Sequence, residues 1–382
     1  MINQFKSLLP ARVDFGPGKI QLLPEMIKGK SVLLLSDQGV KQCGITGRIA
    51  DLCEKESRTM CEFSAIPPEP TEDEVNLVVS SLADVEIDTI IAVGGGSVMD
   101  TAKLVAVMLG GDVTFEQMFA SQLPTRRKSE LIMIPTTAGT GSEGTPNAIV
   151  FRPSLNLKVG IVCDIFMPDR VILDPELLTG LPASITASTG MDALCHALEC
   201  YISNKANLLS DMMAVEATRL IFKSLKRCVT DGHDLEARAD LLLAAFLGGA
   251  CIAASGTNGV HALSYPLGGR YRIPHGISNA ILLAPVFAFN KDCCIDKLAA
   301  VAHLTGADVN GLSSEEKAEV LVQGLYNLSR DLDIPDKMSA LGVPAEDLES
   351  IVDSALQVKR LLDNNPKVMS REDIRSIYQR IL

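Results

Sequence analysis

The stretch Thr89–Lys103, TIIAVGGGSVMDTAK, sets the architecture of the first half of the chain: an apolar strand, three glycines and a helix that opens at Ser97. Consecutive glycines let the backbone approach a ligand closely, and the first turn of a helix offers free N–H groups and partial positive charge to a phosphate. A Walker loop is excluded because no GKS or GKT follows, and the stretch departs from the GxGxxG fingerprint. An ordinary tight turn is the alternative. We favour a site for the pyrophosphate of a dinucleotide.

Short apolar runs and helix-like segments alternate around this stretch. The strand candidates are Ser31–Ser36, Met60–Ala65, Thr89–Val93 and Leu131–Pro135, and the amphipathic stretches between them include Glu72–Ala83 and Val98–Met108. This β, α, β, α order predicts a mostly parallel sheet with helices on both faces.

The second half of the chain has a different pattern. Long helical patterns replace the strands, and they cover Ile185–Ser203, Leu208–Cys228, Leu235–Ala254 and Ser314–Leu332. Two prolines and a glycine interrupt both patterns in DPELLTGLP, residues 174–182. We therefore expect an α/β dinucleotide-binding domain at residues 1–180 and an all-α metal-binding and substrate domain at residues 181–382.

Composition narrows the classes of function. The 382 residues are 47% hydrophobic, and Asp plus Glu (47) outnumber Lys plus Arg (35), giving a formal net charge of -12. This charge would repel nucleic acid and anionic membranes, so neither is an expected partner. The most apolar stretch, Leu241–Ser255, contains two glycines and is too short to span a bilayer. Because the chain has no signal-peptide core and its ten cysteines include no CxxC, we expect reduced thiols and a cytoplasmic location.

Asp37 follows the first strand candidate, in LLLSDQG. A carboxylate there can accept both hydroxyl groups of an adenosine ribose and would repel a 2′-phosphate, which favours NAD over NADP. Asp before Gln and Gly is also ordinary turn chemistry, so a solvated turn residue is the alternative.

A second polar loop, PTTAGTGSEGTPN at Pro135–Asn147, follows the strand candidate Leu131–Pro135. It is rich in hydroxyl groups that suit contacts to phosphate, ribose and the nicotinamide amide. A flexible surface loop is the alternative interpretation of the same composition.

The placement of the five histidines points to a metal site. Asp192 and His196 lie four residues apart on a strongly helical stretch, so both project from one face. His261 follows 65 residues later, and His275 lies 14 residues beyond it, after a turn-rich segment. One carboxylate and three imidazoles can converge on a divalent cation and leave one position open for a substrate. The alternative is a set of separate core or surface histidines, which we expect for His233 and His303.

Four motifs stand in register along the chain: GGGSVMDTAK, PTTAGTGSE, TGMDALCHALE and VHALSYPLGGRYRIPHGISNAILL. In this order and spacing, the chain resembles the iron-containing (group III) alcohol dehydrogenases, and the likeness runs over nearly its whole length. The resemblance implies NAD as cofactor, Fe2+ or Zn2+ as the metal, and a homodimer or larger homo-oligomer.

The resemblance also implies roles for individual residues. The positions that match the metal ligands are Asp192, His196, His261 and His275. The positions that match cofactor contacts are Asp37, Gly94, Gly95, Gly96, Ser97, Asp100, Thr136, Thr137, Thr140, Thr145, Asn147 and Lys158.

One position departs from the family pattern. Many members have a second histidine four residues after the ligand that matches His261, often assigned to proton relay, and this chain has Tyr265 there. A phenol with a reference pKa of about 10 is a poorer base at neutral pH. We name Tyr265 and His275 as the candidate catalytic residues, with water or the cofactor ribose as the alternative proton route.

Arg270 and Arg272 precede His275 in GGRYRIP, and either could supply a guanidinium for a substrate carboxylate. A solvated loop or a subunit contact is the alternative. Hydroxy-acid branches of the family, such as 4-hydroxybutyrate dehydrogenases, also resemble this SYP pattern.

We therefore expect an NAD- and metal-dependent oxidoreductase that interconverts a small alcohol, or an ω-hydroxy acid such as 4-hydroxybutyrate, with its aldehyde or ketone. Two alternatives remain. A lyase of the dehydroquinate synthase type would need a glutamate ligand and more basic residues, and a nucleotide-binding protein without turnover would lack a metal ligand.

Overall fold

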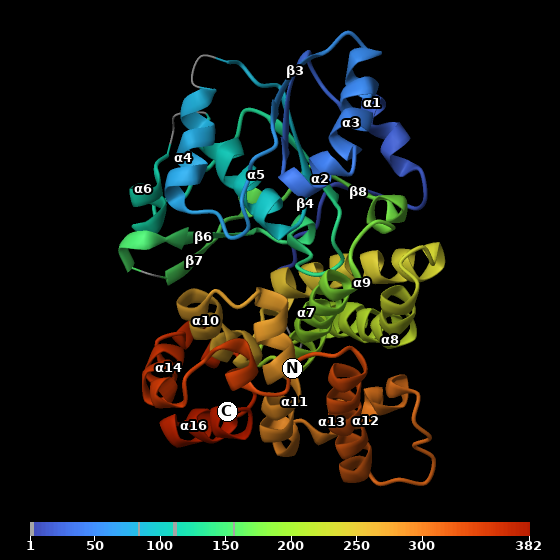
Figure 1. Ribbon diagram of the computed structural model, residues 1–382, viewed down its shortest axis with the longest axis vertical. Coiled ribbons are helices and arrows are strands. Elements are labelled where there is room, and N and C mark those ends of the chain that lie inside the picture. Colours follow the sequence, from blue (N-terminus) through green and yellow to red (C-terminus); the bar gives the residue numbers. More distant parts are fainter. Residues whose placement is uncertain (1–3, 83–84, 110–112, 156) are drawn as a thin grey trace. The chain divides into compact units, whose positions relative to one another are not determined.

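The computed structural model describes residues 4–82, 85–109, 113–155 and 157–382. The chain divides into two compact units: an α/β unit, Leu8–Leu181, and a helical unit, Pro182–Leu382 with the N-terminal segment through Ser7. Figure 1 shows the sheet in the first of these and only helices and loops in the second.

The α/β unit is built on a six-stranded, entirely parallel sheet in the order β1-β8-β5-β4-β2-β3. The strands are β1 (Arg12–Phe15), β2 (Ser31–Ser36), β3 (Thr59–Phe63), β4 (Thr89–Gly94), β5 (Glu130–Pro135) and β8 (Arg170–Leu173). β2, β4 and β5 are apolar along almost their whole length because helices cover both faces of the sheet. The predicted parallel sheet is confirmed. The strands β1 and β8 were not predicted, and neither was the antiparallel pair β6 (Asn147–Arg152) and β7 (Leu157–Val162).

Helices pack on the sheet through alternate strand residues. Leu33 and Leu35 of β2 and Ile90 and Ala92 of β4 share one hydrophobic core with residues of α4, α5 and α6. Figure 1 shows these three helices on one side of the sheet and α1 and α3 on the other. The helices are α1 (Leu23–Met26), α2 (Gln38–Gln42), α3 (Ile45–Glu54), α4 (Glu72–Ser81), α5 (Gly96–Met108) and α6 (Phe115–Phe119). The predicted end of α4 at Ala83 lies outside the described residues.

The strand order identifies the edge of this sheet at which a ligand is expected to bind. After β2 the chain adds β3 on the outer side, and then returns so that β4 pairs with the opposite side of β2. Ligands of open α/β sheets bind at the carboxyl ends of the strands where the order reverses in this way. Asp37 follows β2, and the glycine loop follows β4, so both lie at this point.

The helical unit contains ten α-helices within the described residues: α7 (Ala183–Ile202), α8 (Leu208–Thr230), α9 (Leu235–Ser255), α10 (Gly259–Tyr271), α11 (His275–Asn290), α12 (Ile295–Val301), α13 (Ser314–Asp331), α14 (Leu348–Leu356), α15 (Lys359–Leu362) and α16 (Arg371–Arg380). Capping boxes begin several of them, as at Asn207, Ser313 and Ser370. The predicted all-helical second half is confirmed.

The helix α9 is long and apolar enough to cross a membrane by length and composition alone. It packs against α7 and α8, and 61% of its most apolar window is buried, so packing inside the helical unit explains its composition. All ten cysteines lie within the described residues and are free thiols.

Candidate functional sites

The glycine loop joins β4 to α5, as the sequence predicts, and its glycines are required by close neighbours. A Cβ on Gly94 would lie 2.5 Å from Val98 Cγ2, and one on Gly96 would lie 2.7 Å from Thr140 Cγ2. The helix α5 is 13 residues long and begins at Gly96, so its first N–H groups lie at the loop. This arrangement can receive a phosphate group.

Asp37 lies directly beside the loop. Its Oδ2 would be 3.1 Å from a Cβ on Gly94, while its Oδ1 accepts a hydrogen bond of 2.9 Å from the N–H of Val40 and so caps α2. The cap on α2 therefore uses Oδ1, and the predicted ribose contact would fall to Oδ2. The structure brings Asp37 and the glycine loop together.

The second polar loop meets the glycine loop from the neighbouring strand β5. Thr136 donates its N–H to the carbonyl of Gly94 at 3.0 Å, and Thr137 Oγ1 would be 3.3 Å from a Cβ on Gly95. Thr137 and Thr140 are only partly buried. Their hydroxyl groups therefore lie against the glycines where a bound phosphate is expected.

A buried lysine anchors this second loop. Lys103 Nζ donates to the carbonyl and the hydroxyl of Ser142 at 2.8 and 2.7 Å, to Thr145 Oγ1 at 3.1 Å and to the carbonyl of Asn147 at 2.6 Å. Asp100 Oδ1 lies 3.6 Å from the same Nζ. Burial lowers the pKa of Lys103 to about 8, although Asp100 opposes this shift.

Three residues that were predicted to contact the cofactor, Asp100, Thr145 and Asn147, are thus hydrogen-bonded to other residues of the protein. Asp100 accepts from the Ser142 hydroxyl at 2.5 Å and from the N–H of Ile149 at 2.9 Å, and Thr145 and Asn147 bond Lys103. Their role in holding a cofactor stays a prediction. Lys103 was missed by the sequence analysis, although it closes the GGGSVMDTAK motif.

Ser97 and Lys158 meet at Glu69. The Ser97 hydroxyl accepts from the N–H of Glu69 at 3.0 Å, and Lys158 Nζ lies 2.5 Å from Glu69 Oε1. The structure therefore brings Lys158, from β7, to the start of α5. Glu69 was not singled out from the sequence.

The four predicted metal ligands converge within the helical unit. Asp192 and His196 lie on α7, His261 lies in the first turn of α10, and His275 is the first residue of α11. One ligand atom from each lies within 4.8 Å of all the others. The Nε2 atoms of His196, His261 and His275 lie 3.7, 3.9 and 3.8 Å from the same Asp192 oxygen.

Burial is uneven around this cluster. Asp192, His196 and His261 are 2–4% exposed, whereas the side chain of His275 is 32% exposed. Burial by itself would raise the pKa of Asp192, but the three imidazoles and the Asn279 amide lower it overall. The accessible side of the cluster is therefore the side of His275.

The donor set fits a divalent cation. Nitrogen and oxygen ligands bind such ions at about 2.0–2.2 Å, and the four ligand atoms, all within 4.8 Å of one another, are close enough to converge on one ion after a small inward movement. One carboxylate and three imidazoles suit Fe2+ or Zn2+.

Two further side chains touch the ligands, and the sequence analysis missed both. Glu199 is fully buried and its Oε2 contacts His261 Nδ1, which raises the pKa of His261 against the effect of burial. Asn279 Nδ2 lies 2.6 Å from Asp192 Oδ1 and 3.1 Å from Nε2 of both His261 and His275. Helical spacing was the available signal, because Glu199 follows His196 by three residues and Asn279 follows His275 by four.

The remaining predicted residues are Tyr265, Arg270 and Arg272, and their surroundings differ. The Tyr265 ring lies 6.3 Å from the His275 ring, centroid to centroid, and so is next to the accessible side of the cluster. Arg270 bonds Asp347 and Ser350 at 2.8 and 2.7 Å, which ties it to the start of α14. Arg272 is exposed and ends α10 with a φ of 53°.

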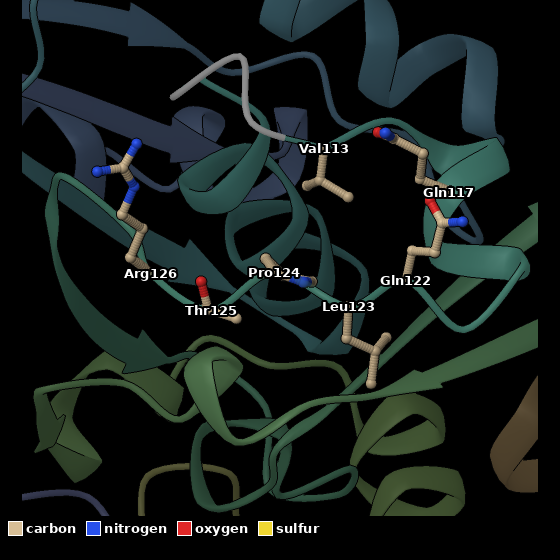
Figure 2. A pocket seen from close by; sticks show the side chains of 7 residues that line it. All are labelled: Val113, Gln117, Gln122, Leu123, Pro124, Thr125 and Arg126. Carbon is tan, nitrogen blue, oxygen red and sulfur yellow. The ribbon is translucent and has the colours of Figure 1, made fainter.

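A cavity of about 500 Å³ lies elsewhere in the α/β unit, between α6 and the start of β5. Figure 2 shows its lining residues, Val113, Gln117, Gln122, Leu123, Pro124, Thr125 and Arg126. None of the predicted site residues is among them. Because these residues precede β5, they lie away from the carboxyl ends of β2 and β4.

Comparison with known proteins covers nearly the whole chain. Residues 10–175 match the family described as iron-containing alcohol dehydrogenase, and residues 186–382 match its C-terminal domain family. The chain is 35% identical over 365 residues to long-chain-alcohol dehydrogenase 1 of Geobacillus thermodenitrificans, covering 94% of this chain and 92% of that protein. It is 30% identical to the NAD-dependent methanol dehydrogenase of Bacillus methanolicus, covering 98% and 99%. A crystal structure of a 1,3-propanediol oxidoreductase is similar with a TM-score of 0.94 and 31% identity over both full chains.

Proposed function

From the premise that the chain belongs to the iron-containing alcohol dehydrogenase family, we propose an NAD-dependent, divalent-metal-dependent oxidoreductase that interconverts a small alcohol and its aldehyde or ketone. The observation that carries the proposal is the convergence of Asp192, His196, His261 and His275. A nucleotide-binding protein without turnover would not require this ligand set.

The helical unit contributes the metal chemistry in this proposal. Asp192 and the three histidines would hold Fe2+ or Zn2+, and a bound cation supplies Lewis-acid polarisation of the alcohol or carbonyl oxygen. The uneven burial of the ligands supports access of the substrate from the side of His275, next to Tyr265. Tyr265 is the proposed proton-handling group on that side.

The α/β unit contributes the cofactor site. The glycine loop and the N-terminus of α5 would bind the pyrophosphate, and Asp37 Oδ2 would accept ribose hydroxyl groups. Thr137 and Thr140 would add hydroxyl contacts. The B. methanolicus relative is named as NAD-dependent, which supports NAD rather than NADP.

For the substrate we propose a small primary alcohol or an ω-hydroxy acid such as 4-hydroxybutyrate. The B. methanolicus relative, named for methanol, supports a small primary alcohol. Since Arg270 is paired with Asp347, Arg272 is the remaining one of the two candidate guanidinium groups. Arg272→Ala should lower kcat/KM for 4-hydroxybutyrate relative to butanol, and an unchanged ratio would remove the ω-hydroxy acid.

The test of the proposed reaction is NADH formation at alkaline pH with a panel of alcohols, after reconstitution of the protein with Fe2+ or Zn2+. Turnover with either metal supports the proposal. The absence of turnover with every metal and alcohol, while NAD still binds, would favour the nucleotide-binding protein. Release of a product without NADH formation would favour the lyase.

We also propose a homodimer or larger homo-oligomer and a cytoplasmic location. The free thiols of all ten cysteines support a reducing compartment. Sedimentation of the purified protein and fractionation of the cells test the two statements.

A further inference from the structure

We propose that Glu199 is a positioning residue that fixes the tautomer and orientation of His261, so that a bare Nε2 faces the other metal ligands. This inference rests on the metal centre proposed above. It adds a fifth side chain to the four ligands: Glu199, which lies on the same face of α7 as Asp192 and His196.

Glu199 is placed by helical spacing. It lies seven residues after Asp192 and three after His196, so all three project from one side of α7. Its exposed fraction is 0%, and a carboxylate in such a place needs a bond for each oxygen.

The first oxygen of Glu199 binds the start of α10. Oε1 accepts the N–H groups of Asn258, Val260 and His261 at 2.9, 2.8 and 3.3 Å. The side chain of Asn258 satisfies the remaining N–H, that of Gly259, at 2.7 Å. The N–H groups of a first helical turn have no partners inside the helix, so Glu199 and Asn258 together account for them. The backbone of His261 is thereby held against α7.

The second oxygen of Glu199 determines where the ring proton lies. Oε2 contacts His261 Nδ1, and a carboxylate accepts hydrogen bonds only, so Nδ1 carries the proton in the neutral ring. Nε2 is then left with its lone pair, 3.9 Å from Asp192 Oδ1.

Asn279 gives independent support for the same tautomer. Its Nδ2 lies 2.6 Å from the acceptor-only Asp192 Oδ1, which identifies that atom as the amide donor. The same Nδ2 lies 3.1 Å from the Nε2 atoms of both His261 and His275, so its second hydrogen is available to either, and a bare Nε2 on His261 fits this neighbour. Glu199 therefore specifies the Nδ1–H tautomer, and the neighbour of Nε2 is compatible with it.

A reciprocal contact keeps Glu199 itself in place. The side-chain amide of Asn258 donates to the backbone carbonyl of Glu199 at 2.7 Å, so α7 and α10 are bonded in both directions. A histidine ligand held in this way is already oriented before metal binds. Loss of such an outer partner typically lowers metal affinity about 10- to 100-fold.

The test uses Glu199→Gln in the full-length chain. Its amide oxygen can still accept from the start of α10, but its NH2 group then faces Nδ1 and favours a proton on Nε2, where the metal would bind. We expect the dissociation constant for Zn2+, measured by competition with a coloured chelator, to rise about 10- to 100-fold. In the metal-free protein at alkaline pH, ¹⁵N NMR of the histidine rings should show the Nδ1–H form of His261 in the native chain and its loss in the variant.

The matched control is Asp174→Asn, which neutralises a fully buried carboxylate that also accepts backbone N–H groups, in the α/β unit. Its Zn2+ affinity should equal that of the native chain. Glu199→Asp keeps an acceptor and should bind Zn2+ more tightly than Glu199→Gln.

The outcomes separate the two proposals. Unchanged Zn2+ affinity in Glu199→Gln, or the Nε2–H form of His261 in the native chain, overturns the role of Glu199 alone. Failure of the native chain to bind any divalent metal overturns the proposed metal centre, whatever the tautomer. If Glu199→Gln does not fold, the tautomer of the native chain still decides the question.

Discussion

Replacing Lys103 with Met should destabilise the α/β unit strongly. Methionine keeps most of the side-chain volume but removes the ammonium group that bonds Ser142, Thr145 and Asn147. The variant also leaves the Asp100 carboxylate buried beside no cation.

The size of the effect follows from burial. The Lys103 side chain is 0% exposed, and removing one partner of a buried ion pair costs about 3–5 kcal/mol because the other charge is left uncompensated. For a domain of this size, such a loss lowers the melting temperature by roughly 6–20 °C. The second polar loop, Pro135–Asn147, would lose its anchor, so NAD affinity should fall as well.

Hydrogen exchange read by mass spectrometry at β4 reports the α/β unit alone. The loss predicts exchange that is roughly 10² to 10⁴ times faster in Lys103→Met than in the native chain. The matched control is Lys41→Met, whose Nζ pairs with Glu62 at 2.9 Å while its side chain is 53% exposed, so that its cost should stay within about 1 kcal/mol. Equal exchange rates in the two variants would refute the reasoning.

Three further outcomes are expected. His261→Ala should lower alcohol turnover by more than about 100-fold while calorimetry still detects NAD binding, and His303→Ala, outside the cluster, should leave turnover unchanged. Asp37→Asn keeps the cap on α2 but removes the charge, so the ratio of kcat/KM for NAD over NADP should fall about tenfold or more; an unchanged ratio would contradict the ribose role. Burial raises the pKa of Glu143 from its usual 4.5 to about 7, so the folded state holds an extra proton between these two pH values. Below these pH values the protonated Glu143 contributes its full stabilisation, and this contribution is lost as pH rises between them. In Glu143→Gln the unfolding free energy, measured by urea titration, should therefore fall less over this pH range than in the native chain.

The sequence predicted the elements whose burial is uniform. β2, β4 and β5 are continuous apolar runs because both faces of the sheet are covered, and the long helices keep their apolar periodicity. β1 is different: its four residues, RVDF, alternate charged with apolar side chains, but the run is short and largely exposed, so this signal of a strand is weak. Its strand character comes from pairing with β8.

The metal ligands on α7 could be predicted from their spacing, but the approach of the other helices could not. A Cβ on Gly276 would lie 2.3 Å from the backbone oxygen of Ser188, so α11 reaches α7 only because this residue is glycine. That contact places His275, and it joins residues far apart in the sequence.

Buried polar residues explain what the sequence analysis missed. Glu199, Asn279 and Lys103 have side-chain types that usually face water, and a single sequence does not show that they are buried. Each is kept inside by bonds to other segments of the chain, which only the folded structure reveals.

The most direct test of the central claim is an anaerobic titration of metal-free protein with Fe2+ in the presence of NAD and a primary alcohol. If Asp192, His196, His261 and His275 hold one catalytic ion, NADH formation should rise linearly with bound metal and reach its limit at one ion per chain. Full turnover by the metal-free protein, or no turnover when the site is filled, would contradict it.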